Sequence, residues 1–284
     1  MTVGTASPLG AAFGRARAEG RAALVGYLPA GYPTVDGAIG ALRAMVDAGV
    51  DIVEVGLPYS DPLMDGPTIQ QAVDAALRSG TTTPDVLRTV EAVASTGAPA
   101  LVMSYWNPID RYGPASFARD LAAAGGAGVI TPDLIPDEAD GWLPAARAQA
   151  LDTIFLVAPS STDARIAMTA EACRGFVYAA STMGVTGARS EVSRAAAELV
   201  ARTRRFTDLP VAVGLGVSSG DQAAELAGFA DGVIVGSAFV RRVLDATDDA
   251  SSRTAVAALA AELGEGVRRG NPAVGRRVVP SSRH

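Results

Sequence analysis

Two carboxylates in the first quarter of the sequence have the types and spacing that could do proton-transfer chemistry. Glu54 lies in the β-branched run VDIVEV, and Asp65 follows it after a proline-rich loop. In an alternating strand Glu54 shares a face with Val50 and Ile52, opposite Val53, so we expect its side chain to point into the interior. Burial there would raise the pKa of the carboxyl towards neutrality, as a general acid and base at pH 7 requires.

Each of these carboxylates also has a structural interpretation. Asp61 directly precedes Pro62 and Asp65 lies two residues before Pro67, and aspartate commonly forms turns near prolines. A glutamate on a buried face can serve in a structural ion pair instead of in catalysis. The residues alone therefore leave both interpretations open.

The residue types that are missing exclude several other mechanisms. All 24 basic residues are arginine, the only histidine is the terminal His284, and the only cysteine is Cys173. Without lysine the chain can form no imine with a substrate or with pyridoxal phosphate. Without an internal histidine there is no base for a Ser-His-Asp or Cys-His site, and no His/Cys zinc site can be built. We therefore expect no metal and no cofactor in this chain, and chemistry that relies on carboxylates, hydroxyls, arginine and backbone amides.

Charge and hydropathy point to a water-soluble protein. The net charge of −6 and the pI near 4.9 argue against nucleic acid or an anionic membrane as a partner. One cysteine allows no internal disulfide, and the longest charge-free run, 92–109, is interrupted by Pro99 and Pro108. The first twenty residues contain no signal-peptide core, so we expect a cytoplasmic location.

The elements that must position the carboxylates alternate regularly along the chain. Eight β-branched runs predict strands near 22–28, 50–56, 99–105, 127–131, 152–157, 175–180, 210–215 and 231–235. Amphipathic stretches predict helices near 8–19, 35–48, 67–79, 84–95, 114–124, 137–149, 162–173, 191–205, 218–228 and 251–268. Eight strand–helix units favour an α/β fold, a single-domain (β/α)8 TIM barrel with an extra N-terminal helix. We expect the barrel to occupy 1–268 and the polar tail 269–284 to be disordered.

Glycines follow the last two predicted strands, where barrels frequently bind phosphate through backbone N–H groups. The residues concerned are Gly214, Gly216, Gly236 and Ser237. Glycine allows close approach of an anion, although tight turns alone would also explain it. A further glycine-rich loop, 184–187, is either a mobile lid or an ordinary connection.

Several motifs, taken together, resemble one enzyme family. EVGLPYSDPLMDGPTIQ, the GVTG loop after FVYAAS, VGLGVSS and DGVIVGSAFV are similar to segments of tryptophan synthase alpha chains. LPAGYP, SYWNPIDRYG and TPDLIPDEA resemble the same family, and the similarity runs in order from about residue 8 to 268. The resemblance implies a barrel lyase that cleaves indole-3-glycerol phosphate into indole and glyceraldehyde 3-phosphate by a retro-aldol reaction.

The resemblance also implies roles for individual residues. Glu54 would transfer the proton and Asp65 would stabilise the indole N–H as positive charge develops on the ring. The matching substrate-binding positions are Tyr27, Val102, Ile130, Tyr178 and Thr186, and core packing would explain the first four equally well. The phosphate-binding positions are Gly187, Gly214, Gly216, Gly236 and Ser237.

A protein partner is implied as well. Alpha chains of this family pass indole to a beta chain that holds pyridoxal phosphate, in an α2β2 heterotetramer. Pro58, Asp61 and Asp133 match residues near that interface, although Asp133 could equally be a turn or helix-start residue after Pro132.

Three alternatives are compatible with parts of this pattern. A stand-alone lyase of the same family would release free indole without a beta chain. A non-catalytic subunit would only activate its partner, but the intact carboxylate pair argues against it. A phosphosugar isomerase such as phosphoribosylanthranilate isomerase would share the phosphate loops, but would have no reason to carry the motif at 54–71.

Overall fold

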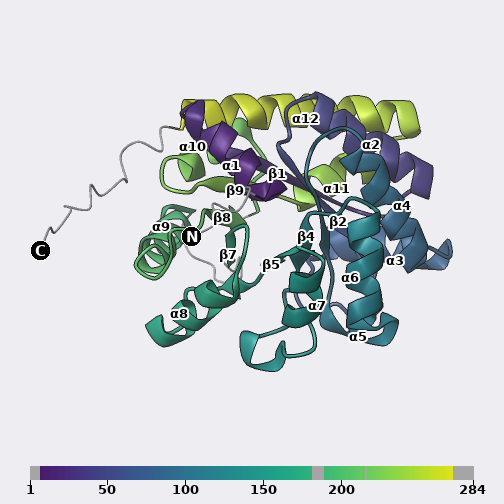
Figure 1. Ribbon diagram of the computed structural model, residues 1–284. Helices are drawn as coiled ribbons and strands as arrows, with labels where there is room; N and C mark the ends of the chain where they lie inside the picture. Colours follow the sequence, from purple (N-terminus) through teal and green to yellow (C-terminus); the bar gives the residue numbers. More distant parts are fainter. Residues whose placement is uncertain (1–6, 181–188, 215, 271–284) are drawn as a thin grey trace, which may run out of the picture.

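The strands form one parallel sheet that curls into a barrel, with helices around it (Figure 1). The computed structural model describes residues 7–180, 189–214 and 216–270. The strand order is β5-β4-β3-β2-β1-β9-β8-β7-β6. The two edge strands of that order are β5 and β6, and only Phe155 separates them in the chain. The predicted strand 152–157 therefore links the two edges of the sheet and closes the barrel. The predicted (β/α)8 barrel is confirmed, with its fifth strand divided in two.

The bounds of the elements follow the sequence pattern closely. The strands are β1 Ala23–Pro29, β2 Ile52–Gly56, β3 Ala100–Met103, β4 Gly128–Ile130, β5 Asp152–Ile154, β6 Leu156–Val157, β7 Val177–Ala180, β8 Val211–Gly214 and β9 Gly232–Val235. The helices are α1 Pro8–Ala18, α2 Val35–Asp47, α3 Pro67–Arg78, α4 Thr83–Ala94, α5 Trp106–Tyr112, α6 Pro114–Ala123, α7 Leu143–Ala148, α8 Asp163–Ala172, α9 Arg189–Thr203, α10 Gly220–Ala227, α11 Ser237–Leu244 and α12 Asp249–Arg269. A short 3-10 turn covers Pro136–Glu138.

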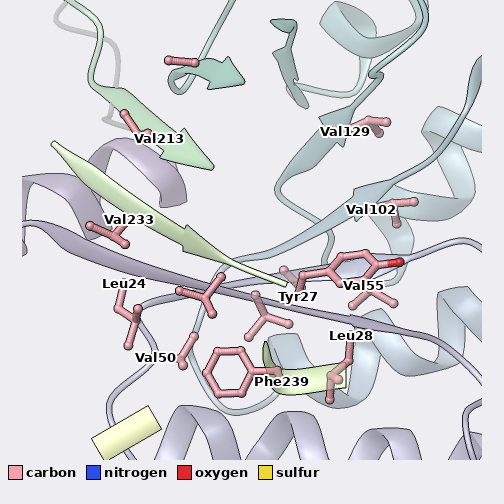
Figure 2. Packing of buried hydrophobic residues seen from close by; sticks show 14 of the residues in the cluster. Leu24, Tyr27, Leu28, Val50, Val55, Val102, Val129, Val213, Val233 and Phe239 are labelled. Atoms are coloured by element: carbon pink, nitrogen blue, oxygen red, sulfur yellow. The ribbon is translucent and has the colours of Figure 1, made fainter. Parts of the chain in front are cut away.

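Side chains alternate between two buried layers along each strand. Val53, Val55, Val102 and Val129 belong to the large layer between the sheet and the helices (Figure 2). Ile52, Leu101, Ile130, Ile154 and Ala212 belong to a smaller cluster inside the barrel. Alternation therefore sends every second residue of a strand inward, which is the arrangement that can carry a side chain into the barrel mouth.

Helix α1 closes the N-terminal end of the barrel. Its buried residues Leu9, Phe13 and Ala16 join the inner cluster, and the rings of Phe13 and Phe176 lie 5.4 Å apart. The helix begins at Ser7, whose hydroxyl accepts a hydrogen bond from the Gly10 N–H, and Pro8 occupies its first turn. The predicted extra helix thus fills one end of the barrel with apolar side chains.

The start of β2 is fixed by a charged contact to the segment before β1. Arg21 donates two hydrogen bonds to the carboxylate of Asp51, at 2.6 and 2.8 Å, and that carboxylate also accepts the Leu24 N–H. Val50 and Asp51 precede the strand, so the predicted alternation holds only from Ile52 onward. Val50 accordingly packs in the outer layer, and its predicted place on the face of Glu54 is wrong.

Three helical segments differ from the prediction, one of them α11 at Ser237–Leu244, which is not among the predicted helices. Residues 106–112 form α5 in spite of Pro108, because proline is tolerated within the first turn of a helix. The predicted helix 137–149 is broken into the 3-10 turn and the short α7. α12 runs to Arg269, one residue beyond the predicted end of the helix at 268, and residues 271–284 lie outside the described structure.

Candidate active site

Glu54 occupies an inward position of β2. Its neighbours in register are Tyr27 on β1 and Leu101 on β3, and its side chain is 1% exposed. Its Oε1 atom has no hydrogen-bond partner among the described residues. Burial raises the pKa of Glu54 to about 8, so the carboxyl is mainly protonated at neutral pH. The expected burial of Glu54 is confirmed.

Asp65 lies in the loop between β2 and α3, and neighbouring residues hold its backbone. The Gln70 side-chain amide donates to the Asp65 carbonyl at 2.7 Å, and the Met64 N–H donates to the Tyr105 hydroxyl at 2.9 Å. Partial burial raises the pKa of the Asp65 carboxyl, while a hydrogen bond from Tyr105 acts in the opposite direction. The two carboxyls therefore occupy different environments, an arrangement that separates acid and anion roles.

Two tyrosines stand close to these carboxyls. The pKa of Tyr27 is raised well above its ordinary value, mainly by burial and then by the charges of Asp65 and Glu54. Burial, followed by the charge of Glu54, also raises the pKa of Tyr178, and both hydroxyls remain protonated. Tyr178 packs against the inner cluster of the barrel, as its predicted place beside Glu54 requires.

Glycines on the adjacent strands make room for these rings. A Cβ at Gly56 would overlap the hydroxyl of Tyr27, and a Cβ at Gly214 would overlap the hydroxyl of Tyr178. A Cβ at Gly236 would meet the Tyr27 ring at 3.4 Å. The resemblance places Gly214 among the phosphate-binding residues; its position against Tyr178 gives it a packing role that the sequence does not indicate.

The apolar wall differs from the prediction at one position. Ile130 lies in the inner cluster, as a pocket residue would. Val102, in contrast, is fully buried in the outer layer with Val55 and Val129, its partners in register (Figure 2). The assignment of Val102 to the substrate pocket is therefore wrong. Met103, the next residue of β3, points inward and is only partly buried, so it is the pocket candidate of this strand.

The candidate phosphate residues cluster at the start of α11. Gly236 directly precedes this helix and offers no side-chain cap, and Ser237 is its first residue. Gly216 follows β8 with φ +62, a conformation that favours glycine. Thr186 and Gly187 lie outside the described residues. Uncapped N–H groups at a helix start suit an anion.

The three candidate partner residues have different environments. Pro58 is buried and lines a cavity of about 360 Å3 with Thr82 and Tyr112. Asp61 is exposed, and its carboxylate accepts the Ser60 hydroxyl proton at 2.5 Å. The Asp133 carboxylate accepts the Trp106 N–H at 2.9 Å, so it caps the start of α5. Asp133 thus caps a helix of another segment, which differs from the predicted turn or helix start after Pro132, and its place at a partner interface stays a prediction.

The described residues contain no group of three or more His, Cys, Asp or Glu side chains that could hold a metal ion. Across the same part of the chain, no helix is both long and apolar enough to span a membrane.

Sequence reasoning missed Met103, Tyr105 and Gln70 at this site. The alternation of β3 identifies Met103 once the inward side of Leu101 is known, because inward residues are two apart. Tyr105 follows the strand in the motif SYWNPIDRYG, and its contact with Met64 depends on the path of a loop from another strand. No local signal in the sequence reports such a contact.

Fold and site together define a (β/α)8 barrel that holds a buried glutamic acid on an inward position of β2. The model of the family "Tryptophan synthase alpha chain" matches residues 13–268. A tryptophan synthase alpha chain of Acidothermus cellulolyticus is 63% identical over 94% of this chain and 99% of its own length. A tryptophan synthase alpha chain of Salinispora tropica is 62% identical over 92% of this chain and 98% of its own length.

Solved structures agree with this result. A crystal structure of tryptophan synthase from M. tuberculosis superposes with a TM-score of 0.86 and 55% identity, covering 93% of this chain and all of that one. The chain belongs to the tryptophan synthase alpha chain family.

The burial of Glu54 predicts a pH-dependent cost in stability. The ordinary pKa of 4.5 is raised to about 8 by folding, so stability from the protonated form is present below about pH 4.5 and is lost as pH rises towards 8. Glu54→Gln stays neutral, so its free energy of unfolding relative to wild type should increase by about 1.4 kcal/mol per pH unit between about pH 5 and 8. Urea unfolding at several pH values measures this. Glu91→Gln, at an exposed position, is the control. If the free energy of unfolding relative to wild type were independent of pH for both variants, the burial effect would be refuted.

The packing role of Gly214 predicts a second stability effect. In Gly214→Ala the new methyl group overlaps the Tyr178 hydroxyl, so we expect a loss of about 1–3 kcal/mol in thermal unfolding. Gly14→Ala, in α1, is the matched control, because no atom lies within 4 Å of the added Cβ. That control should be neutral or slightly stabilising. Equal melting temperatures for both variants would show that Gly214 has no packing role.

Proposed function

We propose that Glu54 and Asp65 carry out the retro-aldol cleavage of indole-3-glycerol phosphate to indole and glyceraldehyde 3-phosphate. The observation that carries this proposal is the buried Glu54 carboxyl, protonated at neutral pH and with one oxygen unpartnered. A neutral carboxylic acid can protonate a carbon, which an ionised glutamate cannot do.

The reaction can be followed proton by proton. Glu54 protonates C3 of the indole ring and becomes a carboxylate. It then takes the proton of the side-chain hydroxyl, while the bond between C3 and the side chain breaks and its electrons neutralise the ring. The hydroxyl carbon becomes the aldehyde of glyceraldehyde 3-phosphate, and Glu54 is again protonated.

Asp65 assists the reaction by stabilising the charged indole ring. The positive charge that forms on the protonated ring is shared with its N–H, which donates to the Asp65 carboxylate. Asp65 is more exposed than Glu54 and receives the opposing hydrogen bond from Tyr105, so it is better able to remain ionised. Tyr27, Tyr178, Ile130 and Met103 supply apolar surface for the ring.

We assign the phosphate group to the part of the mouth at the ends of β8 and β9, which β1 separates from β2. Gly216, Gly236 and Ser237 offer backbone N–H groups at the end of β8 and at the start of α11. Thr186 and Gly187 complete the family pattern from the loop that lies outside the described residues.

We also propose a beta chain as partner, in an α2β2 assembly. Leu63 and Met64, next to Asp65, are 80% and 51% exposed, and large exposed apolar side chains beside a site are typical of an interface. Asp61 lies exposed in the loop after β2, and Asp133 lies exposed in the loop after β4; Pro58, three residues before Asp61, is buried. Pyridoxal phosphate would belong to that partner, because this chain has no lysine to hold it and the proposed cleavage needs no cofactor. The cytoplasmic location remains a prediction from the sequence.

Substitution of the carboxyls tests the chemistry. Glu54→Gln keeps the shape of the side chain but removes its transferable proton, so indole release should fall by at least about 1000-fold, while the affinity for substrate changes less than about threefold. Asp65→Asn should also be severely impaired. Indole release is measured by absorbance, and binding is measured by calorimetry. Near-normal turnover of Glu54→Gln would contradict the assignment.

Activation by the partner distinguishes the alpha-chain function from the stand-alone alternative. Mixing the purified chain with a tryptophan synthase beta chain should raise the rate of indole-3-glycerol phosphate cleavage by one or more orders of magnitude. The stand-alone lyase would instead be fully active by itself, with no increase on mixing and no complex in size-exclusion chromatography.

A further inference from the structure

One hydrogen bond joins the helix that begins at the phosphate site to the helix that follows Asp65. Arg241, on α11, donates from Nη2 to the Oγ1 atom of Thr68, on α3, at 2.7 Å. The two helices come from opposite ends of the chain, and both lie on the same side of the barrel (Figure 1). Arg241 forms no ion pair with any carboxylate of the described residues, so within them Thr68 is its side-chain partner.

At the α3 end, Thr68 stands in the turn that holds Asp65. Gly66 caps this helix without a side chain, and its carbonyl accepts the N–H groups of Ile69 and Gln70. The side chain of Gln70 reaches back from the same turn to the Asp65 carbonyl. A shift of the first turn of α3 therefore moves the backbone of Asp65 directly.

At the α11 end, Arg241 lies one turn after the residues assigned to phosphate. The Val240 N–H donates to the Gly236 carbonyl, which makes the first turn of α11 continuous with Gly236. Phe239 and Val240 are fully buried, and α11 packs against β1, so its place in the barrel is well defined. A phosphate bound at its start thus fixes the position of the Arg241 backbone.

We propose that Arg241 and Thr68 are positioning residues for the cleavage reaction. Their hydrogen bond ties the phosphate-binding helix to the turn that carries Asp65, so it helps to hold the phosphate and indole N–H sites at a fixed distance. The inference rests on the proposed function, because it takes α11 as the phosphate site and Asp65 as the group that stabilises the ring. Neither Arg241 nor Thr68 needs to contact the substrate.

The proposal predicts a particular kinetic pattern. Loss of the connection leaves the phosphate contacts and the Asp65 carboxylate present but less accurately placed, and misplacement acts mainly on the transition state. We expect Thr68→Val, which keeps the shape and removes the acceptor, to lower kcat by about fivefold to tenfold and to change KM by less than about twofold. Thr68→Ser keeps the hydroxyl and should restore kcat to within about twofold of wild type.

Arg241 has a matched control in its neighbour. Arg242 is also exposed on α11, and it makes no hydrogen bond or ion pair with another described side chain. Arg241→Met should reproduce the effect of Thr68→Val, whereas Arg242→Met should leave kcat unchanged. The double variant Thr68→Val/Arg241→Met should be no slower than either single variant, because both remove the same contact.

The test uses the full chain, alone and with a beta chain, and records kcat, KM and melting temperature for each variant. Wild-type kcat in both Thr68→Val and Arg241→Met, or an equal loss in Arg242→Met, would overturn the proposal. A rise in KM with unchanged kcat would overturn it as well, because the pair would then act on binding alone. Failure of the proposed function would look different. In that case the wild-type chain would release no indole, or Glu54→Gln would release it at a near-normal rate.

Discussion

The burial of one carboxyl group inside the barrel is the constraint on which the rest of the site depends. Glu54 is enclosed by parallel strands and by two tyrosines, and burial is the one cause of its raised pKa among the described residues. The low-dielectric surroundings therefore favour the neutral acid, at a cost to stability that grows with pH. The large apolar layers of the barrel supply the stability that offsets this cost. Acid–base chemistry arises here from the location of an ordinary glutamate and requires no unusual side chain.

The sequence predicted the barrel because its information is local and repeated. Alternation within each strand sets which residues face inward, and eight strand–helix units leave few other ways to bury both faces of a parallel sheet. Prediction failed where local pattern and tertiary position differ. Pro108 did not prevent α5, and Phe155 interrupts a strand that the β-branched run 152–157 presents as continuous. Val50 lies before β2 begins, so alternation could not place it.

The same distinction explains the candidate site. Glu54 could be placed because its orientation follows from a two-residue period within one strand, and the resemblance to a family identified Asp65. Val102 was misplaced by one position, which reverses the direction of a strand side chain and exchanges a wall residue for Met103. Tyr105, Gln70 and Thr68 could not be found, because each acts through a contact between segments that only the folded chain brings together.

Helix α1 determines by which end of the barrel substrate enters and products leave. Because its apolar side chains plug one end of the barrel, substrate and both products have to use the other end. Any protein that covers that end would control the order in which molecules enter and leave. An apolar product such as indole could then pass directly into the bound protein. The charged product, glyceraldehyde 3-phosphate, could leave only after that protein moves away from the open end. The apolar side chains of α1 thus leave the barrel with one open end, and a partner bound at that end would control access to the site.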